Sequence, residues 1–299
     1  FLNHRFPAEF EEHEAVWLAW STYENKKGWS TIPVHLKMIE ELSPFVNVKI
    51  AVQDPAEIET VRNILAENEV PAQHVSYHVI PHNDIWIRDM GPNFLVTEDG
   101  NLKMADFNFN VWGYESPQSE GSKIEEKVDE IIAQQMGLNI VSTDVISEGG
   151  NRELNGKGTL IATEAVELQR NPDMSKEEIA EEFKRVLGVE KVIWLKTGAY
   201  EDELTFKGKL PGTEGEKSAY TCITTGGHID EFCRFVSQNT ILLSEVSPEE
   251  AEKDPIAAEN RKRFEESYEI LKNATDQDGN PFEIVRIPTP ETMYEYLEP

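Results

Sequence analysis

The stretch "GGHIDEFCRFV", residues 226–236, sets a histidine and an aspartate between two glycines and an apolar run. If this segment is extended, side chains two residues apart share a face, so His228 and Asp230 are predicted to reach one ligand together. The alternative is a core histidine that its neighbouring acid satisfies, but paired glycines are typical of a crowded strand entrance. Cys233 follows His228 at an odd spacing, which predicts that its thiol faces away and packs into the sheet.

A second stretch, "HNDIWIRDMGP" (82–92), also sets an acid beside a turn. If residues 84–89 are extended, Trp86 and Arg88 share one face and Asp89 takes the other, close to the strand end that Gly-Pro imposes. The alternative for Arg88 and Asp89 is an ordinary ion pair beneath the turn.

In a third stretch, "VISEGGNREL" (145–154), an apolar strand stops at Glu148, for which the alternative is a plain polar turn residue. The three stretches have no metal-ligand spacing such as HExxH or CxxC. Carboxylates that converge without a metal indicate a cationic ligand, and a guanidinium fits because it is planar, permanently charged and carries five N–H donors. Two carboxylates could bind its edges, leaving a third acid and a histidine for proton transfer.

The composition is that of a globular chain with an acidic surface. Its 299 residues carry a net charge of −28, and 39% of them are hydrophobic. Such a surface repels phosphate backbones, which argues against nucleic-acid partners, although most acids are expected on solvated helix faces. No apolar run reaches transmembrane length and no signal pattern opens the chain, so we expect no membrane partner and a cytoplasmic location. Two cysteines predict neither a disulfide framework nor a zinc site.

Strands and single helices alternate irregularly, which predicts a mixed α/β fold in one domain over residues 1–299 rather than a plain doubly wound sheet. A surface excursion is expected over 197–220. Helices are expected over 55–68, with Asp54 as the N-cap, over 122–136, over 176–187, with a capping box of Ser175 and Glu178, and over 248–273, broken at Pro255. Strands are expected over 15–20, 46–52, 74–80, 93–98, 103–109, 139–146, 158–164, 191–196, 228–236, 239–246 and 282–287.

Four motifs, in order along most of the chain, resemble the agmatine deiminase / bacterial-type peptidyl-arginine deiminase family of the guanidino-group-modifying superfamily. They are "FPAEFEEHEAVWLAW" (6–20), "WIRDMGP" (86–92), "EGGN" (148–151) and "GGHIDEFCRF" (226–235). The resemblance implies an α/β-propeller of five ββαβ-like units around a pseudo-fivefold axis, with the active site at the centre.

The resemblance also implies a role for each candidate residue. Asp89 and Asp230 would hold the guanidinium, and His228 would be the general acid/base. Glu148 would orient substrate and assist proton transfer, while Trp86 would wall the pocket. In the family's reaction a cysteine thiolate attacks the guanidinium carbon, ammonia leaves, and water releases the ureido product from a covalent thiouronium. No metal or organic cofactor is implied, the partner is a small cationic guanidino compound, and a homo-oligomer is compatible with the family.

The chain departs from the family at the nucleophile, which lies in a "GGGxxHC"-like motif that does not occur before Pro299. Cys222 is a weak substitute, because two glycines interrupt the strand between it and His228. We therefore expect a fragment or truncation that lacks the C-terminal propeller unit and has little activity alone. The leading function is hydrolysis of agmatine to N-carbamoylputrescine and ammonia. Alternatives are a peptidyl-arginine deiminase, a non-catalytic guanidine-binding protein, and an interaction protein whose acids are merely solvated.

Overall fold

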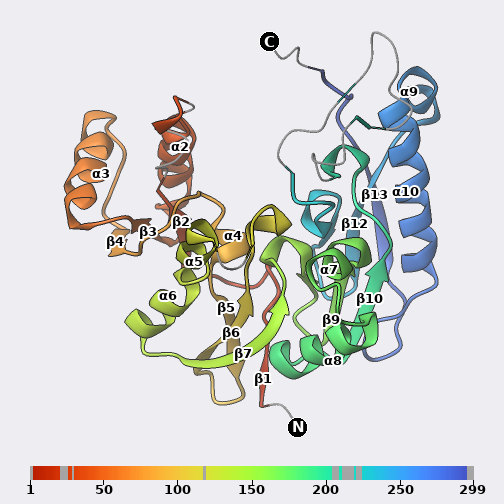
Figure 1. Cartoon of the computed structure of the whole chain (residues 1–299), viewed down its shortest axis with the longest axis horizontal. Helices are drawn as coiled ribbons and strands as arrows, with labels where there is room; N and C mark the ends of the chain where they lie inside the picture. Colours follow the sequence, from red (N-terminus) through yellow and green to blue (C-terminus); the bar gives the residue numbers. More distant parts are fainter. Residues whose placement is uncertain are drawn as a thin grey trace.

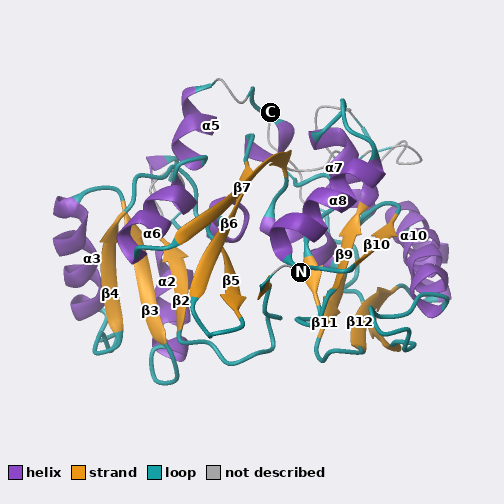
Figure 2. Cartoon of the chain, turned by 90° about the horizontal axis from the view of Figure 1, so that it is seen from below, coloured by secondary structure: helices purple, strands orange, loops and turns teal. Residues whose placement is uncertain are grey.

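The structure, a computed structural model, describes residues 3–20, 26–28, 30–116, 119–203, 209–210, 219 and 224–294. In this part of the chain the strands form four small sheets, ordered β2-β3-β4, β1-β5-β6-β7, β10-β9-β8 and β11-β12-β13. Figure 1 shows the chain passing from the β2–β4 sheet at one side of the molecule to the β11–β13 sheet at the other, and Figure 2 shows the same arrangement from below. The predicted mixed α/β class is confirmed.

The strands are short, and most lie where the apolar runs of the sequence predicted them. Their bounds are β1 His4–Arg5, β2 Ala15–Ala19, β3 Asn47–Val52, β4 Val75–Val79, β5 Asn93–Thr97, β6 Leu102–Asn108, β7 Asn139–Ile146, β8 Glu153–Leu154, β9 Thr159–Thr163, β10 Lys191–Leu195, β11 Cys233–Phe235, β12 Thr240–Glu245 and β13 Glu283–Pro288.

The helices are α2 Ile32–Leu42, α3 Pro55–Glu67, α4 Ile87–Met90, α5 Glu120–Glu125, α6 Val128–Met136, α7 Glu164–Arg170, α8 Lys176–Leu187, α9 Pro248–Lys253 and α10 Pro255–Lys272. Four 3₁₀ turns matter for the site or its surroundings: η1 Val111–Gly113, η2 Gly149–Asn151, η3 Tyr200–Asp202 and η6 Ile229–Glu231. No helix in the described ranges is both long enough and apolar enough to cross a membrane.

Three of the sheets repeat one connection. In each, two antiparallel strands are followed by a pair of helices and a third strand that runs parallel to the second: β5-β6-β7, β8-β9-β10 and β11-β12-β13. A short helical turn precedes the first strand of each unit, namely α4, η2 and η6. The turn η2 contacts both α4 and η6, so the repeat brings the three turns together.

Local capping signals in the sequence set the ends of several helices. The side chain of Asp54 accepts the N–H groups of Ala56 and Glu57 at the start of α3, and Ser175 forms a capping box with Glu178 at the start of α8, both as predicted. The predicted break at Pro255 is also confirmed, because α9 ends just before it and α10 begins there.

Two sequence expectations about element bounds are wrong. The single helix over 122–136 is instead α5 and α6, and the chain bends between them where Glu126 accepts the N–H of Phe109. The strand over 228–236 begins only at Cys233, because Gly226 and Gly227 take φ values of 91° and 115° and the next residues form η6. The excursion predicted over 197–220 lies largely outside the described residues.

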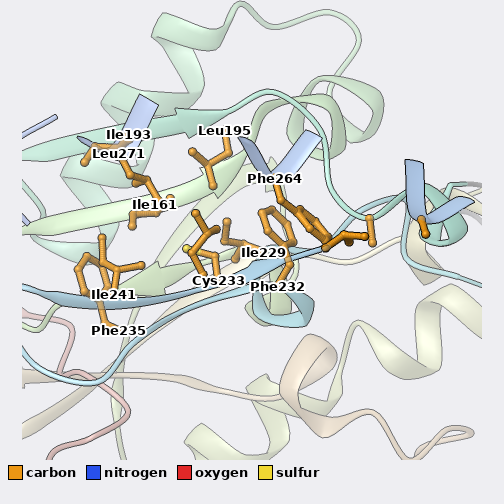
Figure 3. Packing of buried hydrophobic residues seen from close by; sticks show 14 residues of the cluster. Ile161, Ile193, Leu195, Ile229, Phe232, Cys233, Phe235, Ile241, Phe264 and Leu271 are labelled. Atoms are coloured by element: carbon orange, nitrogen blue, oxygen red, sulfur yellow. The ribbon is translucent and has the colours of Figure 1, made fainter. Parts of the chain in front are cut away.

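Apolar side chains between β9, β10, β12 and α10 form the core of the last unit. Figure 3 shows Ile161, Leu195, Ile229, Ile241 and Phe264 packed there, all buried. Each such side chain stabilises the fold by roughly 1.5–3 kcal/mol relative to its exposed state. This core anchors η6, because Ile229 of that turn is one of the core residues.

Candidate active site

The candidate residues meet around the backbone of Gly150, in the turn η2. A Cβ at this position would lie 2.4 Å from Nδ1 of His228, 2.8 Å from Oδ1 of Asp89 and 3.1 Å from Oδ2 of Asp230. Three side chains that the sequence predicted to act together therefore face one point, although Asp89 lies in α4 and is far in sequence from His228, which precedes η6, and Asp230, which lies in η6.

Asp89 lies in α4, so the extended conformation expected for residues 84–89 is wrong. Trp86 caps the N-terminus of this short helix, and the helical turn directs Asp89 to the centre. The N–H of Gly150 donates to Oδ1 of Asp89 at 2.8 Å, and the indole N–H of Trp112 donates to Oδ2 at 2.9 Å. These two donors fix the orientation of the carboxylate.

The ion pair considered between Arg88 and Asp89 is also wrong. Arg88 instead places its Nη1 2.8 Å from Glu9 and its Nε 3.3 Å from Oδ2 of Asp230. Burial raises the pKa of Asp230, and the neighbouring charge of Asp89 adds to this effect, whereas His228 and Arg88 oppose it. The Asp230 side chain is 21% exposed, compared with 8% for Asp89, so it is the more accessible of the two carboxylates.

Glu148 and His228 form a completely buried pair. Nε2 of His228 lies 3.1 Å from Oε2 of Glu148, and Nε of Arg170 donates to Oε1 at 2.8 Å. The reading of Glu148 as a plain turn residue is thereby wrong. Glu148 contacts His228 and Arg170. Its predicted contact with substrate stays a prediction.

The electrostatics of this pair favour an imidazolium beside a carboxylate. Burial alone would lower the pKa of His228, but the charges of Asp89 and Glu148 outweigh it and raise that pKa to about 9. Burial alone would raise the pKa of Glu148, but Arg170 and His228 outweigh it and lower that pKa to about 2. At neutral pH both groups are therefore charged, and Nδ1 of His228 carries a proton toward the centre.

Sequence reasoning missed Asp202, in η3, which holds the turn that carries His228. Its buried carboxylate accepts the N–H groups of Thr225, Gly227 and His228 at 2.9, 2.7 and 3.1 Å. Asp202 lies in the stretch interpreted as a surface excursion, and its distance along the chain leaves no local signal. These bonds also explain why the backbone at His228 turns instead of pairing as a strand.

Sequence reasoning also missed Trp112. Both Val111 and Trp112 have φ near 53°, a left-handed conformation that is costly for bulky and β-branched side chains. The turn is supported by Asn110, whose side chain accepts the N–H of Gly113. Trp112 is buried and directs its indole N–H at Asp89, so the strained turn positions a donor in the site.

The remaining candidates are Trp86, which is exposed, Cys233, which is buried, and Cys222. Trp86 is 56% exposed, and its role as a pocket wall stays a prediction. Cys233 is 1% exposed in the core of the last unit (Figure 3), and burial raises the pKa of its thiol well above the usual value. The predicted packing role of Cys233 is confirmed. Cys222 lies outside the described residues.

Within the described ranges no group of three His, Cys, Asp or Glu side chains is arranged to hold a metal ion. A cavity of about 120 Å³ is lined in part by Arg88, Gly149, Arg152 and Glu153, two of which are chain neighbours of Asp89 and Gly150. Glu153 is buried here, and desolvation raises its pKa to about 7 against the charge of Arg234.

The known proteins that this chain resembles are deiminases of one family. The profile of the Porphyromonas-type peptidyl-arginine deiminase family matches residues 5–207 and 214–298. The agmatine deiminase of Medicago truncatula is 30% identical over 98% of this chain and 73% of its own length. The agmatine deiminase of Pseudomonas aeruginosa is 28% identical over 97% of this chain and 72% of its own length.

Solved structures share the fold. The agmatine deiminase of Enterococcus faecalis superposes with a TM-score of 0.75 at 23% identity, over 97% of this chain and 72% of that chain. An agmatine deiminase of C. jejuni with substrate bound superposes with a TM-score of 0.75 at 24% identity, over 99% of this chain and 77% of that chain. The mixed α/β arrangement of several small sheets is thus common to all three.

Proposed function

We propose that this chain, which belongs to the agmatine deiminase / Porphyromonas-type peptidyl-arginine deiminase family, carries the substrate site of a hydrolytic deiminase. The substrate is a small guanidino compound, and agmatine is the leading candidate. The reaction converts the guanidine and one water molecule into a ureido group and ammonia, with N-carbamoylputrescine as the product from agmatine.

The observation that carries this proposal is the ring of Asp89, Asp230 and His228 around Gly150. A guanidinium is held best by carboxylates that accept along its edges, and each of the two aspartates has lone pairs beyond those that its present donors use. Trp112 and the N–H of Gly150 hold Asp89 in place before substrate binds. Such preorganisation lowers the entropic cost of binding.

His228 is proposed to move the proton. Its imidazolium, held by Glu148 on the far side, donates a proton to the departing nitrogen when a thiolate attacks the guanidinium carbon. Ammonia leaves, and a covalent thiouronium remains. The neutral imidazole then takes a proton from the water that attacks this intermediate, which releases the ureido product and restores the thiolate.

The attacking thiolate is proposed to be a residue other than Cys233. That thiol is buried in an apolar core and its raised pKa disfavours the thiolate. We accordingly expect these 299 residues to bind agmatine and to turn it over slowly at most. Cys222 is the alternative within this chain, and comparing ammonia release before and after Cys222→Ser tests it.

Charge around the site supports agmatine over a substrate with a free carboxylate. Burial raises the pKa of Glu231 to about 8, and the nearby charges of Asp202 and Asp230 add to this. Glu231 is therefore largely neutral at pH 7, and it is the negative charge of Asp202 and Asp230 that attracts the ammonium of agmatine and repels the carboxylate of free arginine. Peptidyl-arginine is the second candidate substrate, because the matching family profile bears that name. The inaccessible Cys233 favours a non-catalytic guanidine-binding protein as another alternative.

The repeated connection of three units supports a finer view of the fold. We propose that the four sheets are units of an α/β-propeller, in one domain over residues 1–299, with the candidate site on its axis. The three turns α4, η2 and η6 would then be the axial ends of their units.

Calorimetric titration of the chain with agmatine, free arginine and an arginine-containing peptide tests the proposal, with putrescine as the guanidine-free control. We expect agmatine to bind. We expect Asp89→Asn, which removes the negative charge, to raise the Kd of agmatine by about 100-fold, which corresponds to about 2.7 kcal/mol. Asp99→Asn is the matched control, because Asp99 lies at an exposed turn where it accepts from Thr97 and Asn101. Equal affinity in wild type and Asp89→Asn, or no binding of any guanidine, would contradict the proposal.

A further inference from the structure

One buried guanidinium contacts several parts of the candidate site. Arg170 is the last residue of α7, and its side chain is 1% exposed. Its Nε donates to Oε1 of Glu148 at 2.8 Å and its Nη2 donates to the carbonyl oxygen of Thr225 at 2.5 Å. Its Nη1 donates to the side-chain oxygen of Gln169. All three nitrogens of the guanidinium are therefore engaged.

Two of these acceptors lie at opposite ends of His228. Glu148 is bonded to Nε2 of the His228 ring, whereas the hydroxyl of Thr225 accepts the backbone N–H of His228 at 3.1 Å. Arg170 thus reaches the imidazole through Glu148 and reaches the backbone turn through Thr225. A shift of this guanidinium would move the ring and its turn relative to each other.

The third acceptor leads toward Asp89. The side-chain oxygen of Gln169 lies 2.8 Å from the point where a Cβ on Gly113 would be, so the two residues pack closely. Gly113 ends the turn η1, and its neighbour Trp112 donates to Asp89. The same guanidinium therefore supports the turn that fixes the first carboxylate.

We propose that Arg170 is a positioning residue of this site, one that holds Glu148, the turn of His228 and the turn of Trp112 in register without touching substrate. Only a planar fork can serve acceptors in these separate directions. A lysine would retain the charge but would offer a single nitrogen, so it would satisfy Glu148 or Thr225 and leave the other without its partner.

Several other charged groups lie around His228 and Glu148. The charged or titratable groups that face His228 are Asp89, Glu148, Asp230, Glu231 and Asp202. The charge of Arg152 also acts on Glu148 and on its neighbour Glu167. Because these groups are unchanged in Arg170→Lys, a change in the site of that variant reports on the fork and not on net charge.

The test compares Arg170→Lys with Arg286→Lys in the complete chain. Arg286, on β13, is the matched control, because its guanidinium also donates to one carbonyl and one carboxylate, those of Ser244 and Glu265. The first readout is the proton resonance of the His228 Nε2–H group, assigned with His228→Gln and recorded without ligand. We expect it in wild type and Arg286→Lys and expect it to be lost to solvent exchange in Arg170→Lys. Its persistence in Arg170→Lys would overturn the inference.

The second readout is agmatine affinity, which rests on the proposed function. We expect the Kd to rise about tenfold in Arg170→Lys and to stay within about twofold of wild type in Arg286→Lys. Failure of wild type to bind agmatine would defeat the proposed function, while the ligand-free resonance would still decide the role of Arg170.

A second variant covers the outcome in which Arg170→Lys does not fold. Gln169 is exposed, so Gln169→Ala is expected to fold while removing one anchor of the guanidinium. We expect it to raise the agmatine Kd about threefold and to broaden the His228 resonance. A sharp resonance at the wild-type position in Gln169→Ala would overturn the inference.

Discussion

A single methyl group at Gly150 should disable the candidate site. The backbone of Gly150 is not left-handed, so alanine is allowed there by conformation, and the effect of Gly150→Ala arises from space alone. The new Cβ would lie 2.4 Å from Nδ1 of His228, and an ordinary contact begins at 3.4 Å, so the ring would have to retreat by 1.0 Å. Behind the ring, Nε2 is already 3.1 Å from Glu148, which Arg170 holds in turn.

The magnitude follows from this lack of room. Overpacking of a tightly packed site costs about 1–3 kcal/mol, so we expect the free energy of unfolding to fall by that amount. The methyl would also push apart the side chains of Asp89, Asp230 and His228, which are proposed to hold the guanidinium. We therefore expect the agmatine Kd to rise about 100-fold or more, which corresponds to at least about 2.7 kcal/mol.

Urea denaturation and calorimetric titration measure the two effects. Gly121→Ala is the control, because Gly121 lies in α5 without a left-handed φ, and the nearest atom to its Cβ would be an oxygen of the exposed, flexible Glu115 side chain at 2.8 Å. That carboxylate can swing away, so this variant should match wild type in binding. If Gly150→Ala bound agmatine with wild-type affinity and stability, the close convergence around Gly150 would be refuted.

Three further predictions concern single groups. Trp112→Phe removes the indole donor of Asp89, and since a hydrogen bond to a charged group contributes about 1.5–3 kcal/mol, titration should show the agmatine Kd raised at least about tenfold. Cys233→Ser should lower the free energy of unfolding by about 1–3 kcal/mol, because a buried hydroxyl replaces an apolar thiol, with no change in agmatine affinity; loss of binding would show that Cys233 belongs to the site. Stability should be greatest between pH 4.5 and 6.5 in urea denaturation across pH. His228 has a folded pKa of about 9 against an ordinary 6.5, so its contribution is complete below pH 6.5 and is lost as pH rises through 9. Glu148 has a folded pKa of about 2 against 4.5, so its contribution is complete above pH 4.5 and is lost as pH falls toward 2. Buried carboxyls with raised pKa values lose their contribution as pH rises from their ordinary pKa toward about 7, or about 8 for Asp129, so they place the maximum at the acid end of this range; they are Glu125, Glu126, Asp129, Glu153 and Glu167. A stability that stayed flat from pH 6.5 to 9 would contradict the charged state of the buried pair.

What the sequence predicts well is set by neighbours along the chain. The cap of α3 at Asp54 and the capping box at Ser175 each involve residues within three positions, and both are confirmed. The burial of Cys233 follows from an apolar run of its own segment. These features need no knowledge of which distant segments will pack together.

What the sequence does not predict is set by distant partners. His228 and Asp230 were grouped by assuming a strand, yet they lie around Gly150 because η6 is a helical turn. Asp202, more than twenty residues earlier, takes the N–H groups that a strand would have paired. Arg170 and Trp112 reach the site in the same long-range way, so no local pattern marks them.

The repeated unit has a consequence for how such a site can change. The turns α4, η2 and η6 each precede the first strand of their unit, but they carry different side chains. Asp89 lies in the first, Gly150 with the preceding Glu148 at the second, and Asp230 with the preceding His228 at the third. The three units share one order of connection, whereas their contributions to the candidate site differ. Substitutions confined to these turns can therefore change the functional groups of the candidate site, while the sheets and helices of each unit keep their packing.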